Sequence, residues 1–469
     1  MEPVKIISKD QLLSIYPDED LTKEILTTLE NHADNPVACW KTLTRDVLRP
    51  DMPPELHHQL FKAVFNQDEK YSDAPAAWFT EPALQKNTNL NKLFKKWGLS
   101  NYDELHQFSV TQKESFWKGM LEELDLPFDK SPEQVLDLSD GIRKPGWLRG
   151  AHYNIAEACF RAPENKTAIV FGKENGEKGK LSYKELQALS SRVANGLKDL
   201  QFGKGDRAAI DMPMTAESVA IYLGVVMAGG AVVSIADSLA PAEVDKRLRI
   251  ANTKLLFTQD VLLRGSKSLP LYEKLLEINP VKTIVLPAKE NVSIPLRDGD
   301  VAWSTFLSDL ETFAPISCNA HDYCNILFSS GTTGDPKAIP WTHTTPIKAA
   351  TDGFAHQDIQ LDDVVCWPTN IGWMMGPWLI FSSLMNKATM ALFYGAPTGR
   401  EFGKFVEEAK VSVLGVVPSM VKRWKQTGSL QGIDWTNIKL FSSTGESSNP
   451  QDYLWLMAQG GYKPVIEYC

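Results

Sequence analysis

The sequence lacks the features that would mark an exported, metal-binding or nucleic-acid-binding protein. Its six cysteines show no CxxC or metal-finger spacing, so we expect reduced thiols in a compartment that does not oxidise them. Acidic residues outnumber basic ones, 58 against 49, and the net charge of −9 argues weakly against nucleic acid as the main partner. The chain contains no repeat of fixed period and no low-complexity segment. Its 43% of hydrophobic and 23% of charged residues are those of an ordinary globular protein.

Long apolar runs are also scarce. The first residues have no apolar stretch of signal-peptide length, and acidic residues follow, so we expect neither a secretory nor a mitochondrial presequence but a soluble intracellular protein. Two uncharged stretches, 218–236 and 366–386, are long enough to be considered as membrane spans. A Gly-Gly pair divides the first and two prolines interrupt the second, so we interpret both as buried α/β elements rather than membrane spans.

The patterning divides the chain near residue 145. Residues 1–145 are helical but irregular and rich in proline, which predicts a helical N-terminal extension and cap. Further on, a capping box at Ser182 opens an amphipathic helix, and strands then alternate with helices. This alternation predicts an α/β fold for residues 146–469, with parallel βαβ units and a sheet covered on both faces. The predicted strands include 207–212, 231–235, 254–258, 283–286, 413–417 and 439–441, and the predicted helices include 216–227, 241–250 and 378–385.

The most specific information lies in residues 326–337. Three apolar residues lead into Ser-Ser-Gly-Thr-Thr-Gly-Asp-Pro-Lys, so that hydroxyls, glycine amides and an ammonium share one short loop. Such donors suit phosphate oxygens, because glycine allows close backbone approach and Lys337 adds a mobile charge. The spacing is not that of a Walker loop, since two residues separate Gly334 from Lys337. From spacing alone, a surface turn of common Gly-Asp-Pro and Ser/Thr chemistry is an equal alternative.

The complete nine-residue string closely resembles the phosphate-loop signature of the adenylate-forming superfamily, which contains acyl-CoA synthetases, luciferases and peptide-synthetase adenylation domains. Residues 181–186 and 226–237 resemble two further signatures of this superfamily. The resemblance covers about residues 110–469 and is greatest to the acetyl-CoA-synthetase-like branch, particularly the plant peroxisomal acyl-activating enzymes. It implies the large N-terminal domain of these enzymes. The mobile C-terminal domain, with its catalytic lysine, would lie beyond Cys469.

The resemblance also implies roles for individual residues. The ATP phosphates would be bound by Ser329, Ser330, Gly331, Thr332, Thr333, Gly334 and Lys337, with Thr333 and Lys337 catalytic. Thr444, Gly445 and Glu446 would contact adenine and ribose, although Ser447 replaces the family's proline. Trp373 would be a gating aromatic of the acyl pocket and Met374 and Met375 its lining, with core packing as the alternative. Arg247 matches an arginine that contacts CoA, and a solvated helix charge is the alternative. No metal ligand is assigned, because the family's Mg²⁺-binding glutamate falls beyond Cys469.

The function implied is AMP-forming activation of a carboxylic acid, with ATP, Mg²⁺ and CoA as cofactors. Cys469 stands where acetate-type synthetases have a tryptophan, which suggests a medium-chain, long-chain or aryl acid. We expect a peroxisomal or cytoplasmic protein with no membrane span and no nucleic-acid partner. Two alternatives stay open: a truncated, non-catalytic nucleotide-binding or regulatory fragment, and an unrelated phosphotransferase, for which no catalytic aspartate signature is present.

Overall fold

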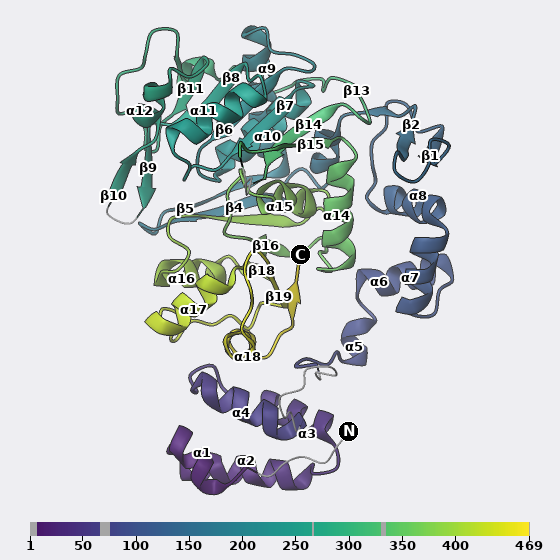
Figure 1. Ribbon diagram of the computed structural model, residues 1–469, viewed down its shortest axis with the longest axis vertical. Coiled ribbons are helices and arrows are strands. Elements are labelled where there is room, and N and C mark those ends of the chain that lie inside the picture. Colours follow the sequence, from purple (N-terminus) through teal and green to yellow (C-terminus); the bar gives the residue numbers. More distant parts are fainter. Residues whose placement is uncertain (1–6, 66–75, 265–266, 330–333, 469) are drawn as a thin grey trace. The chain divides into compact units, whose positions relative to one another are not determined.

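The computed structural model describes residues 7–65, 76–264, 267–329 and 334–468 (Figure 1). The chain forms two compact units. The first contains Met1–Asn87 and Pro397–Cys469, and the second contains Thr88–Ala396. This grouping divides the N-terminal extension at residue 87, whereas the sequence pattern suggested a boundary near residue 145.

A seven-stranded sheet forms the framework of the second unit, in the order β12-β11-β8-β6-β7-β14-β15. All neighbours run parallel except β15, which pairs antiparallel with β14. The central strands are apolar and buried along almost their whole length, as expected for parallel strands covered on both faces. Their bounds are β6 Arg207–Asp211, β7 Ala231–Ile235, β8 Leu255–Gln259, β11 Thr283–Leu286, β12 Val301–Ala302, β14 Tyr323–Phe328 and β15 Ala338–Thr342.

Helices connect these strands much as the sequence predicts. Helix α9 (Tyr183–Asp199) starts at the predicted capping box, in which the Ser182 hydroxyl accepts from the Glu185 N–H and the Glu185 carboxylate accepts from the Ser182 N–H. Helices α10 (Ala216–Met227) and α11 (Pro241–Ile250) have the predicted bounds. The remaining helices of this part of the unit are α12 Tyr272–Leu275, η4 Leu276–Ile278, α13 Trp303–Phe306, α14 Thr345–Ala355 and α15 Met375–Leu384.

The two uncharged stretches are internal elements. Helix α10 is buried along its length apart from one residue, and every residue of α15 is buried. Helix α15 begins at Met375 rather than at residue 378, because Pro377 fits within the first turn, where its missing N–H costs no hydrogen bond. Over the described parts of the chain, no helix is long and apolar enough to cross a bilayer.

Smaller elements complete the second unit. Strands β16 (Val364–Cys366), β17 (Thr389–Tyr394), β4 (Thr167–Lys173) and β5 (Lys178–Ser182) follow one another side by side in a second sheet. A cap precedes them in the sequence and contains α6 Asn89–Trp97, α7 Tyr102–Thr111, α8 Lys113–Glu123, β1 Gln134–Asp137 and β2 Gly146–Arg149. Short segments are β3 His152–Tyr153 paired with β13 Cys318–Asn319, η3 Ile155–Phe160, and β9 Val261–Arg264 paired with β10 Lys267–Pro270.

The first unit joins the N-terminal helices to the segment after residue 397. Trp40 and Leu60 share a buried apolar cluster with Leu454 and Tyr462. His57 is buried in the same core, its Nδ1 hydrogen-bonded to the Tyr462 hydroxyl, and burial lowers the pKa of this imidazole to about 4. The elements are α1 Lys9–Ile15, α2 Glu19–Asn31, α3 Pro36–Thr42, η1 Leu43–Val47, α4 Pro54–Phe65, α5 Pro82–Gln85, α16 Arg400–Glu408, β18 Val413–Val416, α17 Pro418–Thr427, β19 Leu440–Ser443, α18 Pro450–Gln459 and β20 Val465–Glu467, the last three strands being parallel.

Candidate functional site

The predicted phosphate loop connects β14 to β15. Phe328 pairs with Ala338 at the end of the two strands, and beyond this pair the Ser329 N–H donates to the Lys337 carbonyl at 3.1 Å. Gly334 and Lys337 are exposed, and a Cβ added at Gly334 would have no neighbour within 4 Å. Ser330, Gly331, Thr332 and the predicted catalytic Thr333 (residues 330–333) lie outside the described residues. The described ends of the loop therefore lie together, with the Lys337 side chain in solvent.

The loop leaves the sheet at the edge where parallel strands end. The carboxyl ends of parallel strands meet at one edge, which is where α/β sheets bind ligands. The segment of the predicted acyl pocket reaches the same edge. The Asn370 amide donates to the Met212 carbonyl at 3.1 Å, directly after β6. Gly372 lies so close to the end of β7 that an added Cβ would be 2.1 Å from the Ala236 nitrogen, so only glycine fits there.

The three predicted acyl-pocket residues differ in exposure. Trp373 is 52% exposed and Met374 is 45% exposed, whereas Met375 is buried in the first turn of α15. Met375 therefore packs in the core, which was the alternative to a place in the acyl pocket, whereas the side chains of Trp373 and Met374 are accessible to a ligand. Exposure of a large aromatic beside a methionine is unusual for residues that only pack a core.

Arg247 is not the solvated helix charge that the sequence left as an alternative. Its side chain is nearly buried, its Nη1 donates to the Glu243 carboxylate at 2.9 Å, and its guanidinium lies 5.4 Å from the centre of the Phe328 ring. The neighbouring Lys246 ammonium lies 3.6 Å from the Asp335 carboxylate. Helix α11 thus contacts both described arms of the phosphate loop, a relation that no local sequence signal indicates.

Asp211, at the carboxyl end of β6, was overlooked at the level of sequence. Neither of its carboxylate oxygens has a hydrogen-bond partner among the described residues, and the side chain is fully buried. Burial raises the pKa of this carboxyl to about 7, against an opposing contribution from the Lys274 ammonium and with a further increase from Asp237. An acidic residue at the end of an otherwise apolar buried strand is the signal that would have identified it.

His343 follows β15 and has a structural role. Its Nδ1 accepts a hydrogen bond from the Ile155 N–H at 3.1 Å, and the ring lies edge-on to Tyr153. Burial lowers the pKa of His343 to about 4, so the imidazole is neutral at physiological pH.

The predicted adenine-binding residues belong to the first unit and follow β19. Gly445 has φ +91°, a conformation that L side chains rarely adopt. The Glu446 carboxylate accepts hydrogen bonds from the Ser419 N–H and the Ser419 hydroxyl, each at 2.8 Å. Ser419 lies in the first turn of α17, so Glu446 serves as an anionic cap of that helix. Thr444 is partly exposed at the start of the loop.

Across the described ranges, no group of three or more His, Cys, Asp or Glu side chains is arranged to hold a metal ion. The five cysteines in these ranges are free and buried.

The chain matches the AMP-binding enzyme family over residues 155–468, and the acetyl-coenzyme A synthetase N-terminus over residues 102–159. Since the first match spans most of the chain, the protein belongs to the family of AMP-binding enzymes. Within this family it is an AMP-forming acid–CoA ligase, in the branch of the acyl-activating enzymes.

Curated relatives support this branch. The chain is 42% identical to the hexanoyl-CoA synthase of Cannabis sativa, over 96% of this chain and 67% of that protein. It is 40% identical to the probable acyl-activating enzyme 17, peroxisomal, of Arabidopsis thaliana, over 99% of this chain and 68% of the relative. Identity to the probable acyl-activating enzyme 18, peroxisomal, of the same plant is 43%, over 92% and 63%. The chain therefore spans about two thirds of the length of these relatives.

A solved structure confirms the predicted fold. The acetoacetyl-CoA synthetase from Streptomyces lividans superposes with a TM-score of 0.76 at 23% sequence identity, over 83% of this chain and 63% of that one. The α/β architecture with parallel sheets is thus the one predicted from the sequence.

Proposed function

We propose that the enzyme converts a medium-chain or aryl carboxylic acid into its CoA thioester through an acyl-adenylate. The observation that carries this proposal is the position of the loop between β14 and β15, with exposed Lys337 at the ligand-binding edge of a parallel sheet. The relative from Cannabis sativa is named for hexanoyl-CoA, which favours a medium-chain acid. Such a reaction belongs to fatty acid metabolism.

In the proposed first step, a carboxylate oxygen attacks the α-phosphorus of ATP. The bond from this phosphorus to the bridging oxygen breaks, and pyrophosphate leaves with the electron pair. The thiol sulfur of CoA then attacks the acyl carbon, loses its proton and displaces AMP. Because both nucleophiles belong to the substrates, the protein contributes positioning and charge neutralisation. Lys337, Ser329 and Gly334, with residues 330–333, are the groups that would hold the phosphates.

We assign the acyl pocket to Trp373 and Met374, with Met375 behind them. The accessible indole and thioether present an apolar, adaptable surface suited to an alkyl or aryl group. The close contact of Gly372 with the end of β7 fixes the position of this segment at the sheet edge.

For the nucleoside we assign Thr444, Gly445 and Glu446. Gly445 leaves room for a close approach of the base. The chemistry of Glu446 fits a ribose or adenine partner only if one of its oxygens accepts a further hydrogen bond beside those from Ser419, and a carboxylate has that capacity.

Magnesium would accompany ATP in this reaction and supply charge neutralisation on the phosphates. The described residues offer no cluster of three ligands for it. Contacts of the ion with the ATP phosphates themselves, rather than a dedicated protein cage, agree with the usual behaviour of Mg²⁺.

CoA is the second substrate. We assign Arg247 an indirect role in its binding, through the position of α11. Its guanidinium is engaged with Glu243 and Phe328, so direct contact with CoA would need that side chain to turn. A peroxisomal location is proposed from the names of the two Arabidopsis relatives.

The test is acid-dependent exchange of labelled pyrophosphate into ATP. The assay is run on this chain and on this chain extended by the C-terminal third of an acyl-activating relative, with a panel from acetate to decanoate and with benzoate. Exchange that favours medium-chain or aryl acids in the extended protein supports the proposal. If no acid promotes exchange although ATP binds, the chain is a nucleotide-binding fragment instead.

A further inference from the structure

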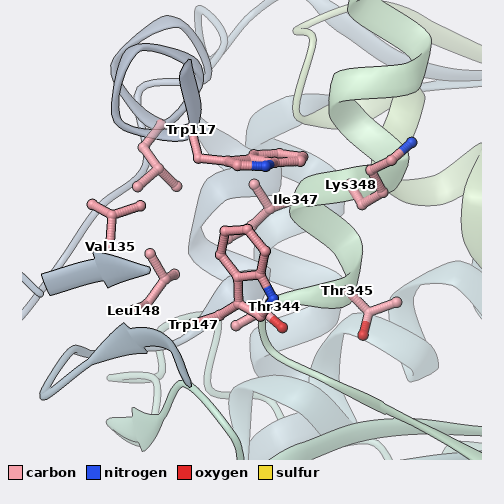
Figure 2. A pocket seen from close by; sticks show the side chains of 9 residues that line it. Trp117, Val135, Trp147, Leu148, Thr344, Thr345, Ile347 and Lys348 are labelled. Atoms are coloured by element: carbon pink, nitrogen blue, oxygen red, sulfur yellow. The ribbon is translucent and has the colours of Figure 1, made fainter. Parts of the chain in front are cut away.

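A cavity of about 310 Å³ lies between the cap and the start of α14 (Figure 2). It is separate from the phosphate loop, because the loop meets β15 at Ala338 whereas the cavity lies beyond Thr342, at the opposite end of the strand. Five residues of strand span roughly 15 Å. The volume falls within the lower part of the range of ligand pockets, roughly 300–1,000 Å³.

The walls of the cavity are mainly apolar. Trp117 of α8 and Trp147 of β2 contact each other edge to face, with ring centres 5.7 Å apart. Val135 of β1 and Leu148 of β2 lie to one side of these rings in Figure 2, and Ile347 of α14 is drawn between the two rings. The cap residues fall within the match to the acetyl-coenzyme A synthetase N-terminus, and Ile347 falls within the AMP-binding match.

Leu148 is held in an unusual conformation at this place. Its backbone has φ 52°, in the left-handed region that non-glycine residues seldom occupy, and its side chain is 3% exposed. Such a conformation persists only where the surroundings determine it, and it is common beside ligand sites.

One end of the cavity is polar. Among the described residues that line it, Lys348 is the one that carries a charge, and Figure 2 shows its side chain directed away from the two tryptophan rings. The Lys348 side chain is 58% exposed and pairs with Asp352, which also lies 3.8 Å from His356. The Asp352 side chain is only 8% exposed, so this pair is kept, and the remaining N–H donors of the Lys348 ammonium can still bind a second anion.

We propose that this cavity binds the hydrocarbon tail of a small amphiphile with a single anionic head, of the fatty-acid carboxylate class. The apolar walls and the two tryptophans accept the tail, and the head remains at the solvent rim beside Lys348. A nucleotide would leave its polar groups unpaired against these walls. Because the walls come from both the cap and α14, occupancy ties the cap to the α/β body.

The inference does not depend on the proposed reaction, and it is tested by binding alone. Octanoate, octylammonium and octanol are titrated into the chain by calorimetry. Octanoate binds most tightly if the head group pairs with Lys348. Val135→Trp fills the cavity and is expected to weaken octanoate by at least about tenfold, because burial of the tail drives binding. Val110→Trp, at an exposed position of α7, is the matched control and leaves binding unchanged.

Lys348→Gln tests the head group. It is expected to weaken octanoate about three- to fivefold while octanol is unaffected, since an exposed ion pair contributes modestly. Lys118→Gln changes the same charge on α8 outside the lining and is expected to have no effect. Octylammonium that binds as tightly as octanoate would overturn the assignment of an anionic head.

Binding at the predicted acyl pocket is distinguished by Met374→Trp. If Met374→Trp loses octanoate binding while Val135→Trp binds octanoate as tightly as the unchanged protein, the ligand lies at the acyl pocket and the proposal is overturned. If Val135→Trp does not fold, a second experiment uses octanoate that is brominated at the end of its tail. Quenching of tryptophan fluorescence by this ligand should fall in the double variant Trp117→Phe, Trp147→Phe, and unchanged quenching would contradict the assignment.

Discussion

The loop after β14 and the loop after β19 carry the two sets of predicted nucleotide-binding residues. The charged side chains of these two loops differ in their exposure and in their hydrogen bonds. Lys337 is exposed in the first loop. In the second, the Glu446 carboxylate already accepts two hydrogen bonds from Ser419. The exposed Lys337 side chain is therefore accessible to a ligand, whereas any ligand of Glu446 shares the carboxylate with the start of α17. Residues that match a family signature predict where a charged side chain lies in the sequence. The hydrogen bonds of that side chain in the structure show whether it is available to a ligand.

The largest effect is expected for Lys337→Met, which removes the ammonium of the first loop and keeps most of the length of the side chain. Loss of one group that stabilises developing charge lowers catalysis by about 10²–10³-fold. The rate of pyrophosphate exchange in the extended protein measures this. Lys184→Met, on the exposed surface of α9, is the matched control. An unchanged exchange rate would show that the loop does not hold the phosphates.

Asp211 at the same sheet edge predicts a pH dependence of stability. The native carboxyl, with its pKa raised from 3.8 to about 7, retains a proton that the unfolded chain releases at lower pH. The native state is therefore favoured below pH 4, loses this contribution as pH rises to 7, and bears the full cost of the buried charge above it.

Asp211→Asn should remove that dependence. The gain in unfolding free energy relative to the unchanged protein is expected to grow with pH and to reach about 2–4 kcal/mol at pH 8, since one pKa unit corresponds to about 1.4 kcal/mol. Urea denaturation between pH 5 and 8 measures it. Asp309→Asn, whose side chain is fully exposed, provides the control. Parallel pH profiles for Asp211→Asn and the unchanged protein would contradict the raised pKa.

Arg247 tests whether α11 supports the first loop. Arg247→Ala removes the stack on Phe328 and the bonds to Glu243, so we expect a loss of about 1–3 kcal/mol in unfolding free energy. Arg249→Ala, on the same helix with a side chain 71% exposed, should cost much less.

The reaction assays sharpen the role of Arg247. Pyrophosphate exchange needs no CoA, so slower exchange in a folded Arg247→Ala protein indicates support of the phosphate loop. A rise in the KM for CoA alone would instead favour the contact that the family resemblance implies.

Much of the fold could be predicted because its signals are local. The capping box at Ser182, the proline at the start of α11 and the glycine pair before β7 each determine conformation within a few residues. The predicted phosphate loop rests on the same kind of signal, because it is a contiguous string.

The remaining features depend on contacts between distant segments. Arg247 meets Phe328 and Glu446 meets Ser419 only once strands and helices have packed. The buried state of Asp211 likewise depends on neighbours from other strands. Periodicity predicts which face of an element is buried, but it does not indicate which polar group finds a partner there.

The smallest effect is expected in the second loop, where Glu446→Ala and Ser419→Ala separate capping from ligand binding. Each should lower the unfolding free energy by about 1 kcal/mol, the usual value of a helix cap, and their double variant should cost less than the sum because they share the hydroxyl–carboxylate bond. Titration of ATP then distinguishes the roles. If Glu446 binds the nucleoside, Glu446→Ala weakens ATP binding and Ser419→Ala, which leaves the carboxylate in place, does not. An ATP affinity that stays at the value of the unchanged protein in both variants would mean that the carboxylate stabilises α17 only, and that the two loops differ in function as well as in their contacts.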